Sequence, residues 1–205
     1  MSNQDEKVLP EVQIVCDVAQ DGTFGYKNPD DHKNQMPWGH ISADMKNFQA
    51  LTSSGIVMMG KGTYWSLSEK FRPLPGRHNV VIGRKNTPSQ SAHVSVFSDI
   101  DSALNACHQS FPDTTVFLIG GKQLIESFLS PEKDYAKHVS TIHRTMIMRD
   151  VAVNEEGVVK DKNTFVFFDE MLHPDRNFTD FFLKTSKAFP ESGIKITTYV
   201  ARREV

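Results

Sequence analysis

The chain has 205 residues, 39% of them apolar and 23% charged, and its 23 Lys and Arg against 25 Asp and Glu leave a net charge of −2. This composition is typical of a single globular domain, excludes a disordered chain, and argues against nucleic acid or an acidic membrane surface as a partner. No apolar run reaches the roughly 20 residues of a membrane-spanning helix. A small soluble ligand is therefore the expected partner.

The N-terminal residues 1–11 are polar and acidic and lack the apolar core of a signal peptide. We expect them to form a flexible extension before a single domain over residues 12–205. Cys16 and Cys107 fit reduced thiols of a cytoplasmic protein. Two cysteines, and eight histidines without ligand spacing, predict no metal site. No extended apolar surface pattern is left over, which favours a monomer.

Short apolar runs alternate in chain order with stretches of helical periodicity, and Gly and Pro separate them. Residues 12–19 predict a buried strand, 20–35 a long polar loop, and 42–52 a helix with Ser42 as its cap. The strands that follow are expected at 56–59, 79–83, 93–97, 115–121 and 138–146. The helices between them are expected from about 64 to 68, from 98 to 109 with Ser98 as the cap, and from 122 to 129.

The C-terminal third has a different pattern, because residues 180–189 and 193–202 flank the turn signal PESG and predict an antiparallel hairpin. A charged segment at about 149–163 precedes it, and the sequence assigns that segment no role. Repeated strand–helix–strand units favour parallel pairing with helices on both faces. The predicted fold class is therefore α/β, a single domain with a mixed, mostly parallel central sheet, flanking helices and a C-terminal antiparallel hairpin.

The stretch GIVMMGKGT nearly matches the phosphate loop of nucleotide triphosphatases, with Gly55, Gly60 and Lys61 in place. That loop needs a strand before its first glycine and flexible residues between the two glycines. Here the intervening residues are themselves the strand, and Gly62 stands where Ser or Thr would bind magnesium. The triphosphatase interpretation is rejected, although the strand still delivers a glycine turn to a helix.

Three predicted strands end in glycine followed by a cation. These ends are Gly60 with Lys61, Gly83 with Arg84 and Lys85, and Gly120–Gly121 with Lys122. Ligands of open α/β sheets bind outside the carboxyl ends of the strands, where backbone N–H groups attract anions. Several such ends favour a phosphorylated dinucleotide over ordinary solvated turns. The G-x-G-x-x-G fingerprint of the Rossmann fold is absent.

Asp44 shares one side of its predicted helix with Phe48 and Leu51, where a core residue is expected. An unpaired carboxylate is rarely placed there. Asp44 either caps the helix or lies at its rim near the N-terminus, or it binds an amidine-like N–H pair of a ligand through two charge-assisted hydrogen bonds. The second interpretation makes its pKa open to tuning for proton transfer.

The ordered set Met36-Pro37-Trp38, Asp44, Phe48, VMMGKGTYWSL, RPLPGR and VFLIGG resembles the dihydrofolate reductase family. The resemblance spans about residues 12–146 and extends weakly through the final hairpin. It implies an NADPH-dependent reduction of 7,8-dihydrofolate to tetrahydrofolate, in support of thymidylate and one-carbon metabolism, with antifolates as further ligands.

For the substrate, the resemblance makes Asp44 the acid that holds the pterin 2-amino group and N3 and promotes N5 protonation, with water as the proton carrier. Phe48 packs on the pterin and benzoyl rings, and Arg77 pairs with the glutamate α-carboxylate. Ser140 stands where the family has a Thr bonded to the acid. The remaining residues on the substrate side are Val15, Met45, Leu74 and Ile119, and Met36 and Trp38 are placed with Asp44 at the reaction centre.

For the cofactor, the resemblance assigns Lys61, Gly62 and Thr63 to the pyrophosphate turn and Lys61 with Arg84 to the 2′-phosphate of NADPH. Gly120–Gly121 matches a pair often joined by a cis peptide. Residues 20–38 correspond to a mobile loop that closes over the nicotinamide, with Met36 near the ring. The full expected set also includes Cys16, Asp17, Phe24, Gly25, Gly60, Ile82, Gly83, Lys85, Lys122 and Gln123.

The sequence departs from the family pattern at several places. The loop at 20–38 is longer than usual, SEKF at 68–71 lengthens the segment before Arg72, and Ile125 replaces a common tyrosine. Asp17 stands where a small residue is normal beside the carboxamide. A second acid near Asp44 is expected to raise the pKa of one of the two or to crowd the nicotinamide.

Two alternatives remain open from the sequence. One is the related reductase that acts on a ribosylated pyrimidine of riboflavin synthesis, against which Asp44, Phe48 and Arg77 favour folate. The other is a non-catalytic structural protein that keeps the fold, against which the retained acid, arginine and phosphate turns argue.

Overall fold

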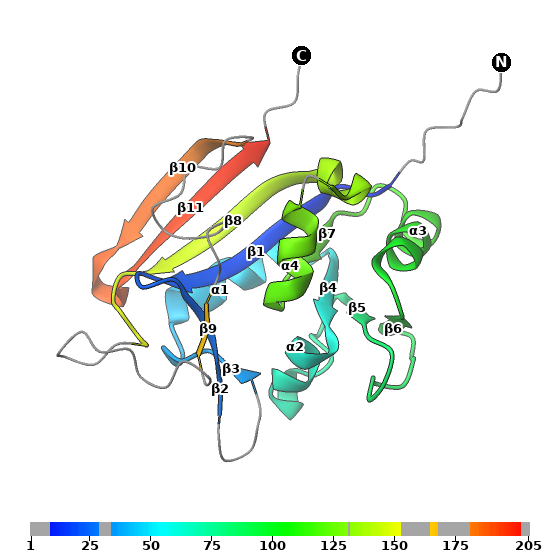
Figure 1. Cartoon of the computed structure of the whole chain (residues 1–205), viewed down its shortest axis with the longest axis horizontal. Coiled ribbons are helices and arrows are strands. Elements are labelled where there is room, and N and C mark those ends of the chain that lie inside the picture. Colours follow the sequence, from blue (N-terminus) through cyan, green and yellow to red (C-terminus); the bar gives the residue numbers. More distant parts are fainter. Residues whose placement is uncertain (1–8, 29–33, 131, 153–164, 168–180, 202–205) are drawn as a thin grey trace.

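The computed structural model describes residues 9–28, 34–130, 132–152, 165–167 and 181–201. Its main feature is an eight-stranded sheet (Figure 1). The strands are β1 (Val12–Ala19), β4 (Ile56–Gly60), β5 (His78–Ile82), β6 (Val94–Phe97), β7 (Val116–Leu118), β8 (Val139–Ile147), β10 (Phe181–Phe189) and β11 (Ile194–Ala201). Their order across the sheet is β10-β11-β8-β1-β7-β4-β5-β6.

The strand directions confirm the predicted mixed sheet. From β6 to β8 every neighbouring pair is parallel, whereas β11 runs antiparallel to β8 and β10 antiparallel to β11. A 3-10 turn at Pro190–Ser192 and Gly193, with φ of 62° in the left-handed region, close the hairpin between β10 and β11. The PESG turn predicted from the sequence is therefore the turn observed.

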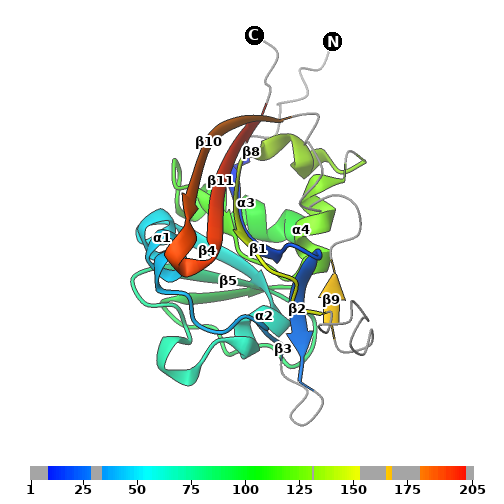
Figure 2. The same ribbon diagram turned by 90° about the vertical axis from the view of Figure 1, so that its left-hand side faces the viewer.

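Four helices cover the two faces: α1 (Ser42–Thr52), α2 (Lys61–Ser66), α3 (Ile100–Ser110) and α4 (Lys122–Leu129). Figure 2 shows α1 on one side of the sheet and α3 and α4 on the other. The alternation of β1 explains this division, because successive side chains of a strand point to opposite faces. Ile14 and Cys16 pack in the cluster of α3 and α4, while Val15 packs in the cluster that includes Phe48 of α1.

The helix starts correct three predictions. Ser42 is the first residue of α1 and not its cap, since Ile41 occupies the cap position and makes no side-chain hydrogen bond to the helix. Asp99 and not Ser98 caps α3, and its carboxylate accepts from the Ser102 N–H at 2.8 Å. A carboxylate accepts more strongly than a hydroxyl, so the neighbouring acid takes the position. The second helix also begins at Lys61 instead of near residue 64.

The polar segment 20–35 is not all loop, which corrects a further prediction. Strands β2 (Thr23–Lys27), β3 (Asn34–Gln35) and β9 (Phe165–Phe167) form a separate three-stranded sheet. The alternation of apolar and polar residues is weak in this segment, and β2 pairs with β9, which lies far along the chain. The sequence therefore gives little local indication of these strands. Residues 29–33 of the segment, the N-terminal residues 1–8 and most of the charged segment 149–163 lie outside the described residues.

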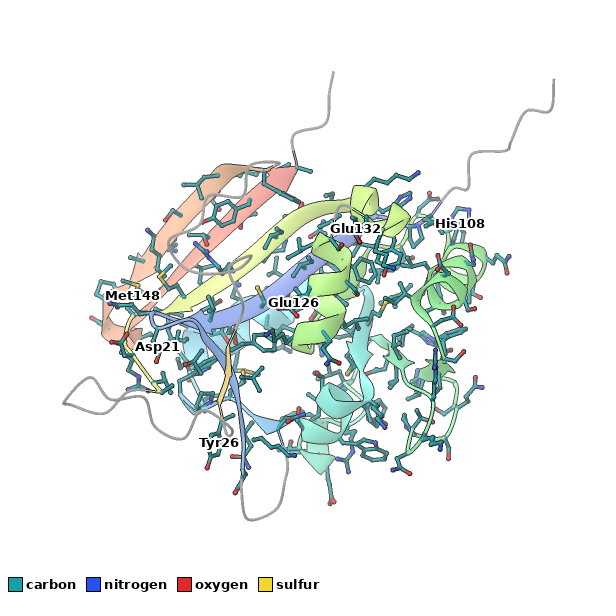
Figure 3. All side chains as sticks on the ribbon, viewed as in Figure 1. Asp21, Tyr26, His108, Glu126, Glu132 and Met148 are labelled. Atoms are coloured by element: carbon teal, nitrogen blue, oxygen red, sulfur yellow. The ribbon has the colours of Figure 1, made fainter. Side chains whose placement is uncertain are left out.

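Asp21 fastens the start of this segment to the chain that leaves β8 (Figure 3). Its carboxylate accepts from the backbone N–H groups of Val151 at 2.8 Å and Ala152 at 2.7 Å, and from that of Thr23 at 3.0 Å. Partial burial raises the pKa of Asp21, but the hydrogen bonds from Thr23, Val151 and Ala152 lower it by more. The net pKa therefore lies below the ordinary value of 3.8. The carboxyl end of β1 is thereby held beside the carboxyl end of β8.

Within the described residues, no helix is both long and apolar enough to cross a bilayer.

Candidate functional site at the carboxyl edge of the sheet

Asp44 lies in the first turn of α1 and is only 6% exposed. Its Oδ1 accepts a hydrogen bond of 2.6 Å from the hydroxyl of Thr145, which lies near the carboxyl end of β8 and is itself buried. Burial raises the pKa of Asp44 above its ordinary value of 3.8, and the hydrogen bond from Thr145 acts in the opposite direction. The structure thus places the predicted acid on the sheet-facing side of its helix with a defined partner.

The partner corrects the prediction that named Ser140. The Ser140 hydroxyl bonds instead to the carboxylate of Glu11 and to the carbonyl of Val12, at the amino end of β8. Ser140 and Thr145 lie on the same strand but five residues apart, so their hydroxyls lie toward opposite ends of β8. Thr145 was missed because the register of β8 against β1, which pairs Thr145 with Asp17, is a tertiary feature.

Asp17 is the second acid at this point of the sheet. Its Cα lies opposite that of Thr145 across the parallel β1–β8 pair, and the Thr145 hydroxyl donates to Asp44. Burial raises the pKa of Asp17 well above 3.8, and the charge of Asp44 raises it further. The sequence-based expectation that Asp17 would perturb the acid pair therefore has a geometric basis.

An apolar wall faces this pair across the space between α1 and the sheet. Phe48 and Ile119 pack, partly buried, against the buried cluster that holds Val15 and Leu74. The four predicted pocket-lining residues thus meet in one cluster, although they come from α1, β1 and two different loops. Because the cluster adjoins Asp44, an apolar ring system there can reach the carboxylate at its edge.

Arg77 lies beside the same wall. Its guanidinium carbon is 5.5 Å from the centre of the Phe48 ring, which is a cation–π distance. Two of its nitrogens donate to the carbonyls of Thr52 at 3.2 Å and Pro75 at 3.4 Å. Burial lowers the pKa of Arg77 below its ordinary value, but a guanidinium stays charged in proteins. These contacts hold a cation at the rim of the apolar wall.

The methionines and the tryptophan predicted near the reaction centre differ in burial. Trp38 is buried in a third cluster with Ala19 and Ile147 at the carboxyl ends of β1 and β8. Met36 and Met45 are exposed by 46% and 38%. Trp38 therefore supports the ends of the two strands, whereas the methionines are accessible to a ligand.

Glycines bring the ends of β4 and β7 into direct contact. The N–H of Gly60 donates to the carbonyl of Gly120 at 2.8 Å, and the peptide between Gly120 and Gly121 is cis, as the resemblance implied. A Cβ atom placed on Gly120 or on Gly121 would lie 3.3 Å from the Thr63 hydroxyl, and φ of Gly120 is 129°. Only glycine fits such a left-handed position without strain.

Cations gather beside these strand ends. Lys61 donates from Nζ to the carbonyl of Lys85 at 2.9 Å, and a Cβ atom on Gly83 would lie 3.2 Å from Lys61 Cβ. Lys61 is thus packed against the turn after β5 that carries the exposed Arg84. The cation predicted at the third strand end, Lys122, forms an ion pair of 3.5 Å along α4 with Glu126. Figure 3 labels Glu126 on that helix.

The other predicted cofactor contacts divide by location. Phe24 lies 3.8 Å from a Cβ atom built on Gly120, and Gly25 follows on β2. Ile82 ends β5, Gly62 lies in α2, and exposed Gln123 lies in α4. Cys16 does not fit through its side chain, which is buried in the cluster on the α3 and α4 face, where burial raises its pKa to about 12. Only the backbone of Cys16 can face the site.

These features define an α/β protein with a candidate ligand site at the carboxyl edge of a mostly parallel sheet, where a buried carboxylate and an apolar wall adjoin glycine turns with cations. The chain belongs to the dihydrofolate reductase family, whose sequence profile matches residues 11–166.

Individual relatives agree with this assignment. The chain is 37% identical over 132 residues to a bifunctional dihydrofolate reductase-thymidylate synthase of Paramecium tetraurelia, covering 63% of this chain and 25% of the relative. It is 39% identical over 116 residues to dihydrofolate reductase type 3 of Salmonella typhimurium, covering 55% and 61%. A match to dihydrofolate reductase type 9 of Escherichia coli is 28% identical over 179 residues and covers 82% and 96%. The chain thus spans less than two thirds of the first two relatives.

Proposed function

We propose that this protein is an NADPH-dependent dihydrofolate reductase that converts 7,8-dihydrofolate to 5,6,7,8-tetrahydrofolate. The observation that carries the proposal is the buried Asp44, bonded to Thr145 and facing the Phe48 wall, in a chain of this family. The monomeric state and the cytoplasmic location stay predictions.

Asp44 binds the substrate through the N–H pair formed by the pterin N3 and 2-amino group. An ionised carboxylate accepts two parallel charge-assisted hydrogen bonds, and the Thr145 hydroxyl fixes its orientation. Phe48 packs against the ring system, and Arg77 pairs with the glutamate carboxylate of the substrate. The cation–π contact and the two carbonyl partners orient the Arg77 guanidinium before the ligand arrives.

The chain offers a fitting place for a dinucleotide phosphate. Gly83, Gly120 and Gly121 allow backbone approaches that a Cβ atom would crowd, and Lys61 is held against the turn that carries Arg84. Lys61, Gly62 and Thr63 hold the pyrophosphate, while Lys61 and Arg84 hold the 2′-phosphate. When bound, NADPH supplies the hydride that is added to pterin C6.

The substrate C6=N5 double bond gains one hydride at C6 and one proton at N5, which balances the reduction. Asp44 raises the basicity of N5 by holding negative charge against the opposite edge of the ring, and water carries the proton. Burial of Asp44 strengthens that electrostatic effect, because the charge is poorly screened by solvent.

The first test is NADPH oxidation with 7,8-dihydrofolate by wild type, Asp44→Asn and the control Asp113→Asn. Asp113 is an exposed acid in the turn before β7, and Asn tolerates its left-handed φ of 64°. We expect Asp44→Asn to lose about a hundredfold or more in kcat/KM near neutral pH and to recover partly in acid, where solvent protonates the substrate.

An inactive wild type that still binds NADPH would exclude the folate substrate and favour the ribosylated pyrimidine of the alternative reductase or a non-catalytic role.

The cofactor assignment is tested separately with Arg84→Ala. We expect the Kd for NADPH to rise about tenfold, since one charge-assisted contact to the 2′-phosphate is lost. The Kd for NADH, which lacks that phosphate, serves as the internal control and should not change. Titration calorimetry of both nucleotides measures the difference, and an equal loss for both would contradict the assignment.

A further inference from the structure

Asp17 shares the substrate face of the sheet with the residues already described. Alternation along β1 places Val15 and Asp17 on the same face, and Val15 belongs to the cluster against which Phe48 packs. Across the parallel β1–β8 pair, Asp17 lies opposite Thr145. The strand pairing alone therefore brings the Asp17 side chain to the hydroxyl that donates to Asp44.

Asp17 and Asp44 meet at Thr145, because Asp17 lies opposite Thr145 across the β1–β8 pair and Asp44 accepts from the Thr145 hydroxyl. Ionisation of both carboxyl groups is therefore unfavourable. Thr145 has a single hydroxyl proton, and that proton is directed to Asp44 Oδ1. Burial first, and then the Asp44 charge, raise the pKa of Asp17 well above 3.8. For Asp44, burial raises the pKa, whereas the hydrogen bonds from Thr145 and Asp17 lower it. The Thr145 hydroxyl, because it donates to Asp44, favours the ionised form there and leaves the proton of the pair on Asp17.

Within the part of the chain that the structure describes, the other charged or titratable groups near the pair supply no counter-charge on this face. The Cys16 thiol faces the α3 and α4 side and stays protonated. On β8, burial lowers the pKa of His143 to about 4, so His143 is neutral, and its ring bonds to Gln13 and Thr198. Arg144 points to the opposite face, where it donates to the Tyr199 hydroxyl at 2.7 Å.

We infer that Asp17 is a positioning residue of the pterin site, whose protonated carboxyl donates to Asp44 and keeps the Asp44 carboxylate ionised and oriented toward its ligand. The inference rests on the proposed function only for the identity of that ligand. Two donors, Asp17 and Thr145, hold one acceptor from the side of the sheet. Loss of the Asp17 proton leaves two adjacent negative charges and ends this arrangement.

Two substitutions distinguish the hydrogen bond that Asp17 donates from the ability of Asp17 to ionise. Asp17→Asn keeps an N–H donor toward Asp44 and cannot ionise, whereas Asp17→Ala has no donor. Near neutral pH we expect Asp17→Asn to stay within about threefold of wild type in kcat/KM, and Asp17→Ala to lose about tenfold or more, mainly through KM. Above the Asp17 pKa, the ratio of wild-type to Asp17→Asn activity should fall by about tenfold for each pH unit.

A measurement on the ligand-free protein tests the proton without any turnover. The stability contributed by a group with a raised folded-state pKa is complete below its ordinary pKa, and is lost as the pH rises through the raised value. In chemical denaturation, wild type should therefore become progressively less stable than Asp17→Asn as the pH is raised above about 4. The exposed control Asp113→Asn should show no such trend.

The outcomes are distinguishable. A stability difference that grows with pH supports the Asp17–Asp44 pair even if wild type does not reduce dihydrofolate, which would overturn only the proposed substrate. Dihydrofolate turnover with a constant stability difference, and an Asp17→Ala variant as active as wild type, would overturn the inference and leave the proposed function standing.

Discussion

The two faces of β1 differ in chemistry although they alternate along one strand. The face toward α3 and α4 is apolar and buried throughout, whereas the face toward α1 carries polar groups that all have partners on β8 or α1. The first face consists of Val12, Ile14, Cys16 and Val18, and the second of Gln13, Val15, Asp17 and Ala19. The comparison shows that apolar packing on one face can hold a strand in place while the other face carries the polar groups of the candidate site.

Burial of side chains stabilises the fold on the apolar face and destabilises it on the face that carries the carboxyl groups. Each aliphatic side chain buried on the apolar face contributes roughly 1.5 to 3 kcal/mol relative to exposure. Burial of carboxyl groups on the other face is unfavourable unless they are paired and hydrogen-bonded. The apolar face therefore offsets the cost of placing Asp17 and Asp44 in a poorly solvated position.

The largest expected effect lies on the apolar face. Phe128 of α4 is fully buried, and its ring centre lies 4.8 Å from that of Tyr135. Phe128→Ala should lower the free energy of unfolding by about 3 to 5 kcal/mol, because a large cavity replaces the ring. Denaturant unfolding measures this loss, and the half-exposed Phe71→Ala is the control, with an expected change below about 1 kcal/mol. A changed pH dependence of the remaining activity would show that the faces are not independent.

The next effect lies on the polar face. Thr145→Val keeps the shape of the side chain but removes the hydroxyl that donates to Asp44. We expect kcat/KM to fall about ten- to a hundredfold, since hydrogen bonds to charged groups are worth about 1.5 to 3 kcal/mol.

Thr197→Val is a matched control for this experiment, because its buried hydroxyl donates to the carbonyl of Arg144 and has no contact with Asp44. Steady-state kinetics should show little change in that variant. Equal losses of activity in the two variants would mean that sheet stability, and not the orientation of Asp44, limits turnover.

The smallest effect concerns His143, which shares the polar face but bonds to Gln13 and Thr198 and not to the acids. Its folded-state pKa of about 4 is below the ordinary 6.5, so the unfolded chain binds a proton first as the pH falls. Between pH 7 and 5, wild type should lose about 1 to 2 kcal/mol more stability than His143→Gln. Denaturation at the two pH values measures the difference, and the exposed His40→Gln should behave as wild type. Parallel losses in wild type and His143→Gln would contradict this account.

The sequence predicted much of this arrangement because its strongest signals are local. The bounds of β1 and α1, the hairpin, and the glycine-ended strands agree with the structure within a few residues. Asp44 was identified for a physical reason, namely a charged residue at helical spacing with Phe48. The meeting of Phe48, Leu74 and Ile119 in one place followed from the family resemblance and not from spacing.

What the sequence did not predict depends on pairing between distant strands. Thr145 and Ser140 are both small hydroxyl residues of β8, and only the register against β1 decides which of them meets Asp44. The register also shifts between Val12 and Gln13, which spacing along the chain does not indicate. Strand β2 was missed because one of its partners, β9, lies far along the sequence, and the two-residue β3 pairs in turn with β2.

The C-terminal hairpin bears on how freely this protein can change over evolution. It lies beyond residue 166, where the family match ends, and β11 holds β8 through a ladder that runs from Ile194 to Val200. Backbone groups make this ladder, so it depends little on which side chains the outer strand β10 carries. Substitutions along β10 can therefore accumulate in a lineage while the position of Thr145, and with it the chemistry, is inherited unchanged.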